Sequence, residues 1–447
     1  MPQSRWANVP FAPRALPFFY GWVMVAGSVL ATLASVPGQT MGVGVFTESL
    51  ERAWQVSSVQ LSFAYMIGTI ISSFLLPYAG VLLDRHGARV SVAVSSLGLG
   101  IAMVLLAEVE RLPLPPGVVT PYIVLALGAF SFMALRFFGQ GCLTLCARYV
   151  IGQWFDRQRG FATAIAGAFA SFGFSYSPVV INDLVAANGY RATLYVLALV
   201  VGGGMTAVGW LLYRDNPEEC GLLPDGARAP EPGAALDAAA ENDLPDLNRA
   251  QALKTLGFWA FSLALASHGL LITALTFLIA PLGAEAGLTR DEAFALFWPM
   301  AVFSVLANLG VGAIGNRADA RVFLVTMMAM QALGTFALLY LDQGWARVLL
   351  AIGYGTAGGI FANLVTTVWP RFFGRMHLGA ISGFNMSVLV FSSALGPLLF
   401  SSIESLAGSY RPALWGWFMV PATIATVGLF ARNPRAAHEA AQRGTKP

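Results

Sequence analysis

Long apolar runs alternate with short polar segments along almost the whole chain of 447 residues. A helix needs roughly 20 apolar residues to cross the hydrocarbon core of a bilayer. Its backbone polar groups must then find partners within the helix, because lipid offers none. We predict a membrane-spanning helix in each run that meets this requirement. These spans 1 to 12 cover approximately residues 19–45, 58–82, 89–108, 119–147, 160–184, 190–213, 256–283, 292–315, 322–341, 346–370, 378–404 and 411–431.

One long polar segment, from Arg214 to Lys254, separates span 6 from span 7. It holds nine carboxylates against four basic residues, a composition typical of a flexible linker. The pattern therefore predicts an all-α membrane protein built of two six-helix bundles. The expected divisions are a tail over 1–18, a bundle over 19–213, a linker over 214–255, a bundle over 256–431 and a tail over 432–447.

The composition excludes a soluble protein, since 57% of the residues are hydrophobic, 11% are charged and the mean hydropathy is +0.67. The basic residues lie at the ends of apolar runs, so the net charge of +3 does not indicate nucleic-acid binding. Cys142 and Cys146 lie within a span and Cys220 in the linker, which argues against a disulfide framework. We interpret the first two as packing residues rather than metal ligands, and we expect no cofactor. The prolines of residues 1–18, which lead directly into span 1, argue against a cleavable signal peptide.

The distribution of Lys and Arg predicts the orientation. With a cytoplasmic N-terminus, the short inner loops hold nine basic residues and the tails six more, against six in the outer loops. Those of the inner loops are Arg85, Arg89, Arg148, Arg157, Arg159, Arg317, Arg321, Arg371 and Arg375. We therefore expect a multi-pass protein of the plasma membrane (the inner membrane of a bacterium) with both termini in the cytoplasm.

The two halves of the chain repeat each other. Gly80 to Arg89 closes span 2, and Gly312 to Arg321 closes span 8 with Gly, Arg and Arg at the same offsets. The stretch from Trp154 to Gly167 is echoed by Phe372 to Gly383. Two parallel repeats with a substrate site at the midplane are what a carrier with two rocking bundles requires.

The first repeated segment resembles the signature loop of the major facilitator superfamily. Its motif residues are Gly80, Asp84, Arg85, Gly87 and Arg89, and the degenerate second copy includes Asn316 and Arg317. The resemblance covers essentially the whole chain and implies the major facilitator fold. It also implies that the motif is part of an inner gate, with the Asp84 carboxylate at the start of span 11, near Leu378–Ser382.

Further segments resemble the branch with monocarboxylate porters and oxalate/formate antiporters. They are Tyr20–Trp22, Trp154–Gly160, Asn216–Gly226, Phe373–Gly383 and Ala394–Pro397. That branch often carries on span 8 an Arg that holds a carboxylate. Here the position is Asn308, with Ser304 one turn earlier in place of an acid. The usual anion contact is therefore missing, and Arg136 on span 4 is its candidate substitute.

Arg136 places a charge near the middle of span 4. Such a charge costs about 2.5–3.5 kcal/mol on insertion scales, and no Asp or Glu in the middle of another span offers a partner. The position suggests an anion site. Its setting also loosely resembles a span 4 motif in which the Arg serves proton coupling or structure, and this alternative stays open.

By the resemblance, spans 1, 4, 7 and 10 line the cavity, with contributions from spans 5, 8 and 11. Polar residues near mid-depth are the candidate substrate-binding residues: Arg136, Gln140, His268, Ser304, Asn308, Tyr354, Asn363, Gln39, Thr40 and Asn385. The asparagines can equally be hydrogen-bonding residues between packed helices. His268, with an ordinary pKa near 6.5, is the candidate proton carrier. The alternative is a His that is satisfied by neighbouring backbone at a helix contact.

These observations predict a secondary active carrier of a small organic anion, a carboxylate in the first place, that works by symport or antiport. We expect a monomer in the lipid bilayer, with protons as a candidate coupling ion and no nucleic acid. A proton-coupled efflux pump for amphipathic compounds is the rival within transport. A membrane sensor would need an output domain, which the sequence lacks. An enzyme is not expected, because the sequence shows no metal-ligand cluster and no nucleophile with a mid-span His and acid.

Overall fold

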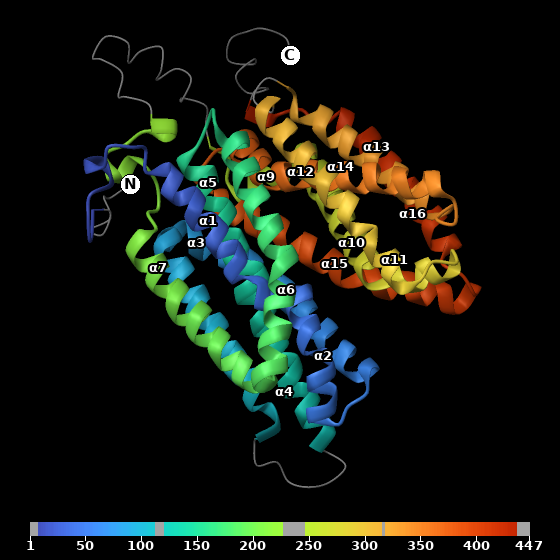
Figure 1. Ribbon diagram of the computed structural model, residues 1–447. Coiled ribbons are helices and arrows are strands. Elements are labelled where there is room, and N and C mark those ends of the chain that lie inside the picture. Colours follow the sequence, from blue (N-terminus) through green and yellow to red (C-terminus); the bar gives the residue numbers. More distant parts are fainter. Residues whose placement is uncertain (1–7, 112–119, 227–245, 315–317, 436–447) are drawn as a thin grey trace. The chain divides into compact units, whose positions relative to one another are not determined.

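The computed structural model describes residues 8–111, 120–226, 246–314 and 318–435, which form helices and no strand (Figure 1). In chain order the elements are η1 (Pro13–Ala15), α1 (Gly21–Ala34), η2 (Val36–Gly38), α2 (Thr40–Trp54), α3 (Ser58–Glu108), η3 (Val109–Arg111), α4 (Thr120–Leu135), η4 (Arg136–Leu143), α5 (Thr144–Trp154), α6 (Arg159–Leu197), η5 (Ala198–Gly204), α7 (Met205–Leu212), η6 (Glu218–Cys220), η7 (Pro224–Gly226), α9 (Arg249–Ala252), α10 (Leu256–Glu285), α11 (Arg290–Ala295), α12 (Phe297–Ile314), α13 (Ala320–Leu338), α14 (Gly344–Phe373), α15 (Leu378–Ala407) and α16 (Arg411–Leu429).

Nine helices of the described residues are long and apolar enough to cross a membrane. Two of them, Ser58–Arg111 and Arg159–Leu212, are 54 residues long and each contains two of the expected spans. The chain reverses within them at Gly87 and Gly189, both with a φ of 78° that only glycine adopts readily. The short loops expected between spans 2 and 3 and between spans 5 and 6 are thus tight turns, each made by a single glycine.

Span 1 is broken, which the apolar pattern did not predict. Helix α1 ends at Ala34, a short 3₁₀ turn covers Val36–Gly38, and α2 continues to Trp54, beyond the expected end at residue 45. Pro37 lies in this turn. It has no backbone N–H and its ring hinders a continuous helix, so the break has a local cause.

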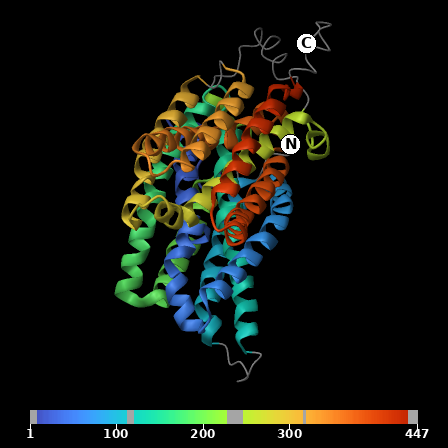
Figure 2. The ribbon, with the colours of Figure 1, turned by 90° about the vertical axis from the view of Figure 1, so that its right-hand side faces the viewer.

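The chain folds into two compact units. Unit 1 comprises Met1–Trp154, Phe169–Gly226 and Ser382–Ser387, and unit 2 comprises Phe155–Ala168, Ala227–Ile381 and Val388–Pro447. The expected bundles 19–213 and 256–431 stay a prediction. Within unit 1, α3 packs against α4, α5 and α7, all in the blue-to-green part of the chain (Figures 1 and 2). Within unit 2, α14 packs against α12 and α13, and α13 against α16.

The first end of the expected linker is folded against unit 1. The Asp215 carboxylate accepts a hydrogen bond from the Arg89 backbone N–H at 3.0 Å, next to the turn at Gly87. The Arg89 side chain donates to the carbonyls of Tyr213 and Val9 at 3.0 and 2.6 Å. Arg89, which was expected in a short inner loop, is thus buried and ties three segments together.

The other end of the linker is folded against unit 2 in the same way. The Asp246 carboxylate accepts from the backbone N–H groups of Arg375 and Met376 at 3.0 and 2.7 Å. These follow Gly374, which has a φ of 87°. The same carboxylate pairs with Arg435 at 3.2 Å. Both described ends of the segment 214–255 therefore belong to the folded units rather than to a flexible chain.

Candidate functional site

Arg136 begins η4, a π-helical turn in the middle of span 4. Its Nη1 donates to the Gly38 carbonyl oxygen at 3.3 Å and to Thr40 Oγ1 at 3.2 Å. The guanidinium carbon lies 5.3 Å from the centre of the Tyr65 ring. These three partners are neutral, and among the described residues no carboxylate pairs with Arg136. Arg136 is 3% exposed. Its charge is therefore stabilised by dipoles and by the face of an aromatic ring, but it is not neutralised.

The break in span 1 accounts for the first of these contacts. Gly38 lies between α1 and α2, so its carbonyl is outside the regular hydrogen bonding of either helix. Unsatisfied backbone oxygens are costly in a membrane, and Arg136 supplies a donor. The fold therefore brings the cation of span 4 to the helix break of span 1.

Two buried side-chain atoms of η4 have no hydrogen-bond partner among the described residues. They are Arg136 Nε, a donor, and Gln140 Oε1, an acceptor. Buried polar groups are nearly always paired, so orphaned atoms mark a strained or ligand-binding position. The edge of the guanidinium formed by Nε and Nη2 makes no hydrogen bond with any described residue, and this is the edge that binds a carboxylate in a bidentate manner.

Tyr65, which lies on α3 in span 2, was not among the residues predicted from the sequence. Its hydroxyl donates to Thr40 Oγ1 at 3.1 Å, and its ring faces the guanidinium of Arg136. A tyrosine in an apolar run resembles a packing residue, and its hydroxyl within a span was the available signal. Gln39, a predicted site residue, instead donates from Nε2 to Ser35 Oγ at 3.0 Å within the break of span 1.

In unit 2, His268 on α10 is 2% exposed and forms part of a polar chain. Gln331 Nε2 donates to Ser267 Oγ at 2.8 Å, so Gln331 Oε1 faces His268 Nδ1 at 3.2 Å as the acceptor. Nδ1 therefore carries the proton in the neutral ring, and Nε2 is left as the atom that can accept one. Phe361 lies against the ring at 4.9 Å between centroids. Gln331, the second missed residue, is a fully buried amide in span 9.

Asn308 and Asn363, on α12 and α14, are brought together. Asn363 Nδ2 donates to Asn308 Oδ1 at 3.3 Å and to the Gly160 carbonyl at 3.1 Å. A Cβ built on Gly167 would come within 2.4 Å of Asn308 Nδ2, so the Asn308 amide lies directly against this glycine. This arrangement corresponds to the alternative in which the asparagines join packed helices.

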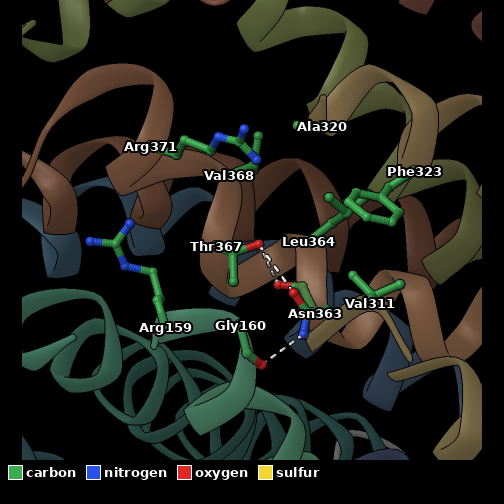
Figure 3. A pocket seen from close by; sticks show the side chains of 10 residues that line it. All are labelled: Arg159, Gly160, Val311, Ala320, Phe323, Asn363, Leu364, Thr367, Val368 and Arg371. Carbon is green, nitrogen blue, oxygen red and sulfur yellow. Dashed lines mark hydrogen bonds between the residues drawn. The ribbon is translucent and has the colours of Figure 1, made fainter. Parts of the chain in front are cut away.

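Figure 3 shows the cavity beside Asn363, in unit 2. Besides Asn363 and Gly160, it is lined by Arg159, Val311, Ala320, Phe323, Leu364, Thr367, Val368 and Arg371. Its volume of about 30 Å³ holds roughly one water molecule. It is therefore too small for an organic anion.

The other predicted site residues lie in unlike settings. Tyr354 is buried in the apolar core of unit 2, with its hydroxyl 3.1 Å from Thr335 Oγ1. Ser304 on α12 is half-buried, with Oγ 3.5 Å from a Cβ built on Gly358. Asn385 on α15 is 1% exposed. Their roles in binding stay predictions.

The expected gate motif is partly described. Gly80 packs against Gly383, where a Cβ on Gly383 would come within 2.8 Å of the Gly80 Cα. Gly87 makes the turn, Asp84 is half-buried and Arg85 is exposed. Asn316 and Arg317 lie outside the described residues. The role of Asp84 as a gate stays a prediction.

The profile of the Major Facilitator Superfamily matches residues 24–397, most of the chain. The chain belongs to this superfamily. Membership confirms the expected fold and the expectation of a multi-pass membrane protein. Members of this superfamily are transporters of small molecules rather than enzymes, as expected for this chain.

Several known proteins are similar to this superfamily member. Human monocarboxylate transporter 7 is 22% identical, over 89% of this chain and 80% of its own. The probable sulfoacetate transporter SauU of Cupriavidus necator is 29% identical over 34% of each chain. The fujikurins efflux protein of Gibberella fujikuroi is 26% identical over 41% of this chain and 37% of its own. The chain thus matches about a third of the length of the last two relatives.

Solved structures agree with the fold. The proton:xylose symporter XylE superposes with a TM-score of 0.68 at 14% identity, over 92% of this chain and 95% of that chain. The human organic anion transporter MFSD10 superposes with a TM-score of 0.59 at 15% identity, over 91% and 99%. At these identities the likeness concerns the fold.

Proposed function

We propose that this transporter carries a small organic anion, a carboxylate or a sulfonate, and that Arg136 binds its negative charge. The proposal includes the orientation expected from the sequence, a plasma-membrane protein with both termini in the cytoplasm. The observation that carries it is the buried guanidinium of Arg136, which has a free Nε–H and no carboxylate partner among the described residues.

The energetics support a ligand at this position. An uncompensated cation near mid-bilayer costs about 2.5–3.5 kcal/mol on insertion scales. The contacts with Gly38, Thr40 and Tyr65 lower this cost but leave a full positive charge. An anion on the free edge removes the charge and adds two charge-assisted hydrogen bonds.

The shape of the free edge favours planar or trigonal oxyanions. Nη1 of Arg136 is occupied by Gly38 and Thr40, which leaves Nε and Nη2 as a parallel pair of donors. Both carboxylates and sulfonates offer two oxygens to such a pair. Two relatives are named for a monocarboxylate and for sulfoacetate, which supports the same class of substrate.

Transport by purified protein in proteoliposomes tests the proposal, with labelled L-lactate and sulfoacetate as probes and with and without a pH gradient. We expect the wild type to accumulate at least one probe. Arg136→Gln should abolish this accumulation, and Arg136→Lys should retain part of it, because an ammonium keeps the charge but not the fork. Arg52→Gln, which removes an exposed arginine, is the matched control.

Uptake by Arg136→Gln at the wild-type rate would refute the proposal, as would failure of the wild type to carry either anion. Each variant should first elute as a folded protein in detergent.

Efflux of amphipathic compounds is the second candidate, favoured by the similarity to the fujikurins efflux protein. Phe169, Phe172 and Tyr176 on α6 are 64%, 71% and 66% exposed and follow one helix face. An aromatic face of this kind suits large apolar molecules. Export of an amphipathic dye that persists in Arg136→Gln would favour efflux over anion transport.

A further inference from the structure

Arg148 lies on α5, twelve positions after Arg136, toward the Trp154 end of span 4. Its Nη1 contacts Met386 Sδ at 3.6 Å, and it makes no other hydrogen bond or ion pair with a described residue. A thioether is a weak acceptor. Arg148 was expected in a short inner loop, but α5 continues past it to Trp154, and Arg148 is half-buried.

The other buried arginines of the described chain have strong acceptors. Arg214 donates to the carbonyls of Leu211, Tyr213 and Phe11. Arg159 donates to the Phe155 carbonyl and pairs with Asp156. Arg89 donates to two carbonyls. Arg148 therefore differs from these structural cations, because its guanidinium retains almost its whole donor capacity.

The π turn brings Arg148 and Arg136 to the same face of span 4. In a regular α-helix each residue turns the chain by about 100°, so positions twelve apart diverge by about 120°. A π turn takes up one extra residue, so the stretch advances like about eleven residues, or about three full turns. The two residues thus follow one line along the helix, with about 16–17 Å between their Cα atoms at 1.5 Å per residue.

We propose that Arg148 is a second binding position for the transported anion, reached from the Trp154 side of the membrane. This inference rests on the proposed function. The anion replaces the thioether of Met386 as the partner of Arg148 and makes a charge-assisted contact. Arg136 then binds the anion deeper in span 4. Met386 keeps the guanidinium in place without neutralising it, because a thioether competes weakly with a carboxylate or sulfonate.

The test compares the two sides of the membrane. In proteoliposomes sorted by orientation, the half-saturating concentration of L-lactate or sulfoacetate is measured from the Trp154 side and from the opposite side. Arg148→Gln should raise it about tenfold from the Trp154 side, the loss expected for one charge-assisted hydrogen bond, and leave the other side within about twofold. From the Trp154 side, Arg148→Lys should give a half-saturating concentration between those of the wild type and Arg148→Gln. Met386→Leu should leave the values from both sides near wild type.

Arg157→Gln is the matched control, because it removes an exposed cation a few residues beyond α5. An equal rise in half-saturating concentration in this control would show that Arg148 acts only through the surface potential, and it would contradict the inference. An equal change from both sides in Arg148→Gln, or wild-type values from both, would overturn the inference. If Arg148→Gln does not fold, Arg148→Lys decides by the same asymmetry, with Met386→Leu as its symmetric control.

Lipid is a second source of anionic oxygens. If the asymmetry in Arg148→Gln disappears in vesicles without anionic lipid, Arg148 binds a headgroup and the inference is wrong. Failure of the inference and of the proposed function are distinguishable. Wild-type transport by Arg136→Gln removes both, whereas loss in Arg136→Gln with no asymmetry in Arg148→Gln removes the second position alone.

Discussion

Gly38 and Gly139 pack backbone to backbone, so that a Cβ built on either glycine would come within 2.8 Å of the Cα of the other. Gly38 lies in the break of span 1 and Gly139 in the π turn of span 4. The contact therefore joins two irregular segments at the place where Arg136 meets the Gly38 carbonyl.

Gly139→Ala should destabilise unit 1 and weaken anion binding. The new methyl group meets backbone atoms of Gly38 and Ser35, which cannot rotate away, and overpacking of this kind costs about 1–3 kcal/mol. Thermal unfolding in detergent measures the first effect and lactate or sulfoacetate uptake the second. Gly44→Ala is the control, because a Cβ there meets nothing within 4 Å. Equal melting temperatures for the two variants would contradict the tight contact.

Tyr65→Phe should weaken substrate binding modestly, by about two- to tenfold in half-saturating concentration. The change removes the hydrogen bond to Thr40 Oγ1 but keeps the ring that faces Arg136. Tyr65→Leu also removes the ring and should lose more, since the guanidinium then lacks its cation–π partner. Tyr78→Phe, at a tyrosine that is 70% exposed, should match wild type. A Leu variant no worse than the Phe variant would show that the ring face contributes nothing.

His268 should make transport depend on pH, with uptake rising as the external pH falls from about 8 to 5. Its Nδ1–H is held by Gln331, so a proton must enter at Nε2 and is favoured when an anion accompanies it. His268→Gln should flatten the profile. Gln331→Leu should instead lower thermal stability by about 1–3 kcal/mol, because it leaves His268 and Ser267 without a partner. An unchanged pH profile in His268→Gln would remove His268 from the mechanism.

Cys220 should react slowly with thiol reagents in the folded protein. Burial raises the pKa of the Cys220 thiol to about 12, above the value near 8.5 of an exposed cysteine. At pH 8.5 its thiolate fraction should then be about a thousandfold below that of the unfolded chain, so unfolding should speed alkylation. Because the thiol has a higher pKa in the folded chain, it contributes to the free energy of unfolding at pH values below about 8.5. This contribution is lost as the pH rises from about 8.5 toward 12. Alkylation of a variant with Cys142→Ala and Cys146→Ala, followed by mass spectrometry, gives the rate. Fast labelling without denaturant would contradict the burial.

Much of the candidate site could be read from single residues. Arg136 stood out because a charge within an apolar run is costly wherever its neighbours lie. His268 stood out as a side chain within an apolar run that can take up a proton near neutral pH. Their partners could not be read in this way. Tyr65 and Gln331 became visible when the fold brought them to Arg136 and His268, each more than 60 residues away in the chain.

The sequence by itself determined the spans, because a helix in lipid satisfies its backbone within its own residues and shows this as a continuous apolar run. The signature from Gly80 to Arg89 likewise identified the superfamily. The tertiary structure decided the rest: the single-glycine turns at Gly87 and Gly189, the close approach of Gly38 to Gly139, and the π turn that begins at Arg136. The approach of Gly38 to Gly139 depends on contacts between distant segments of the chain, which no local pattern records.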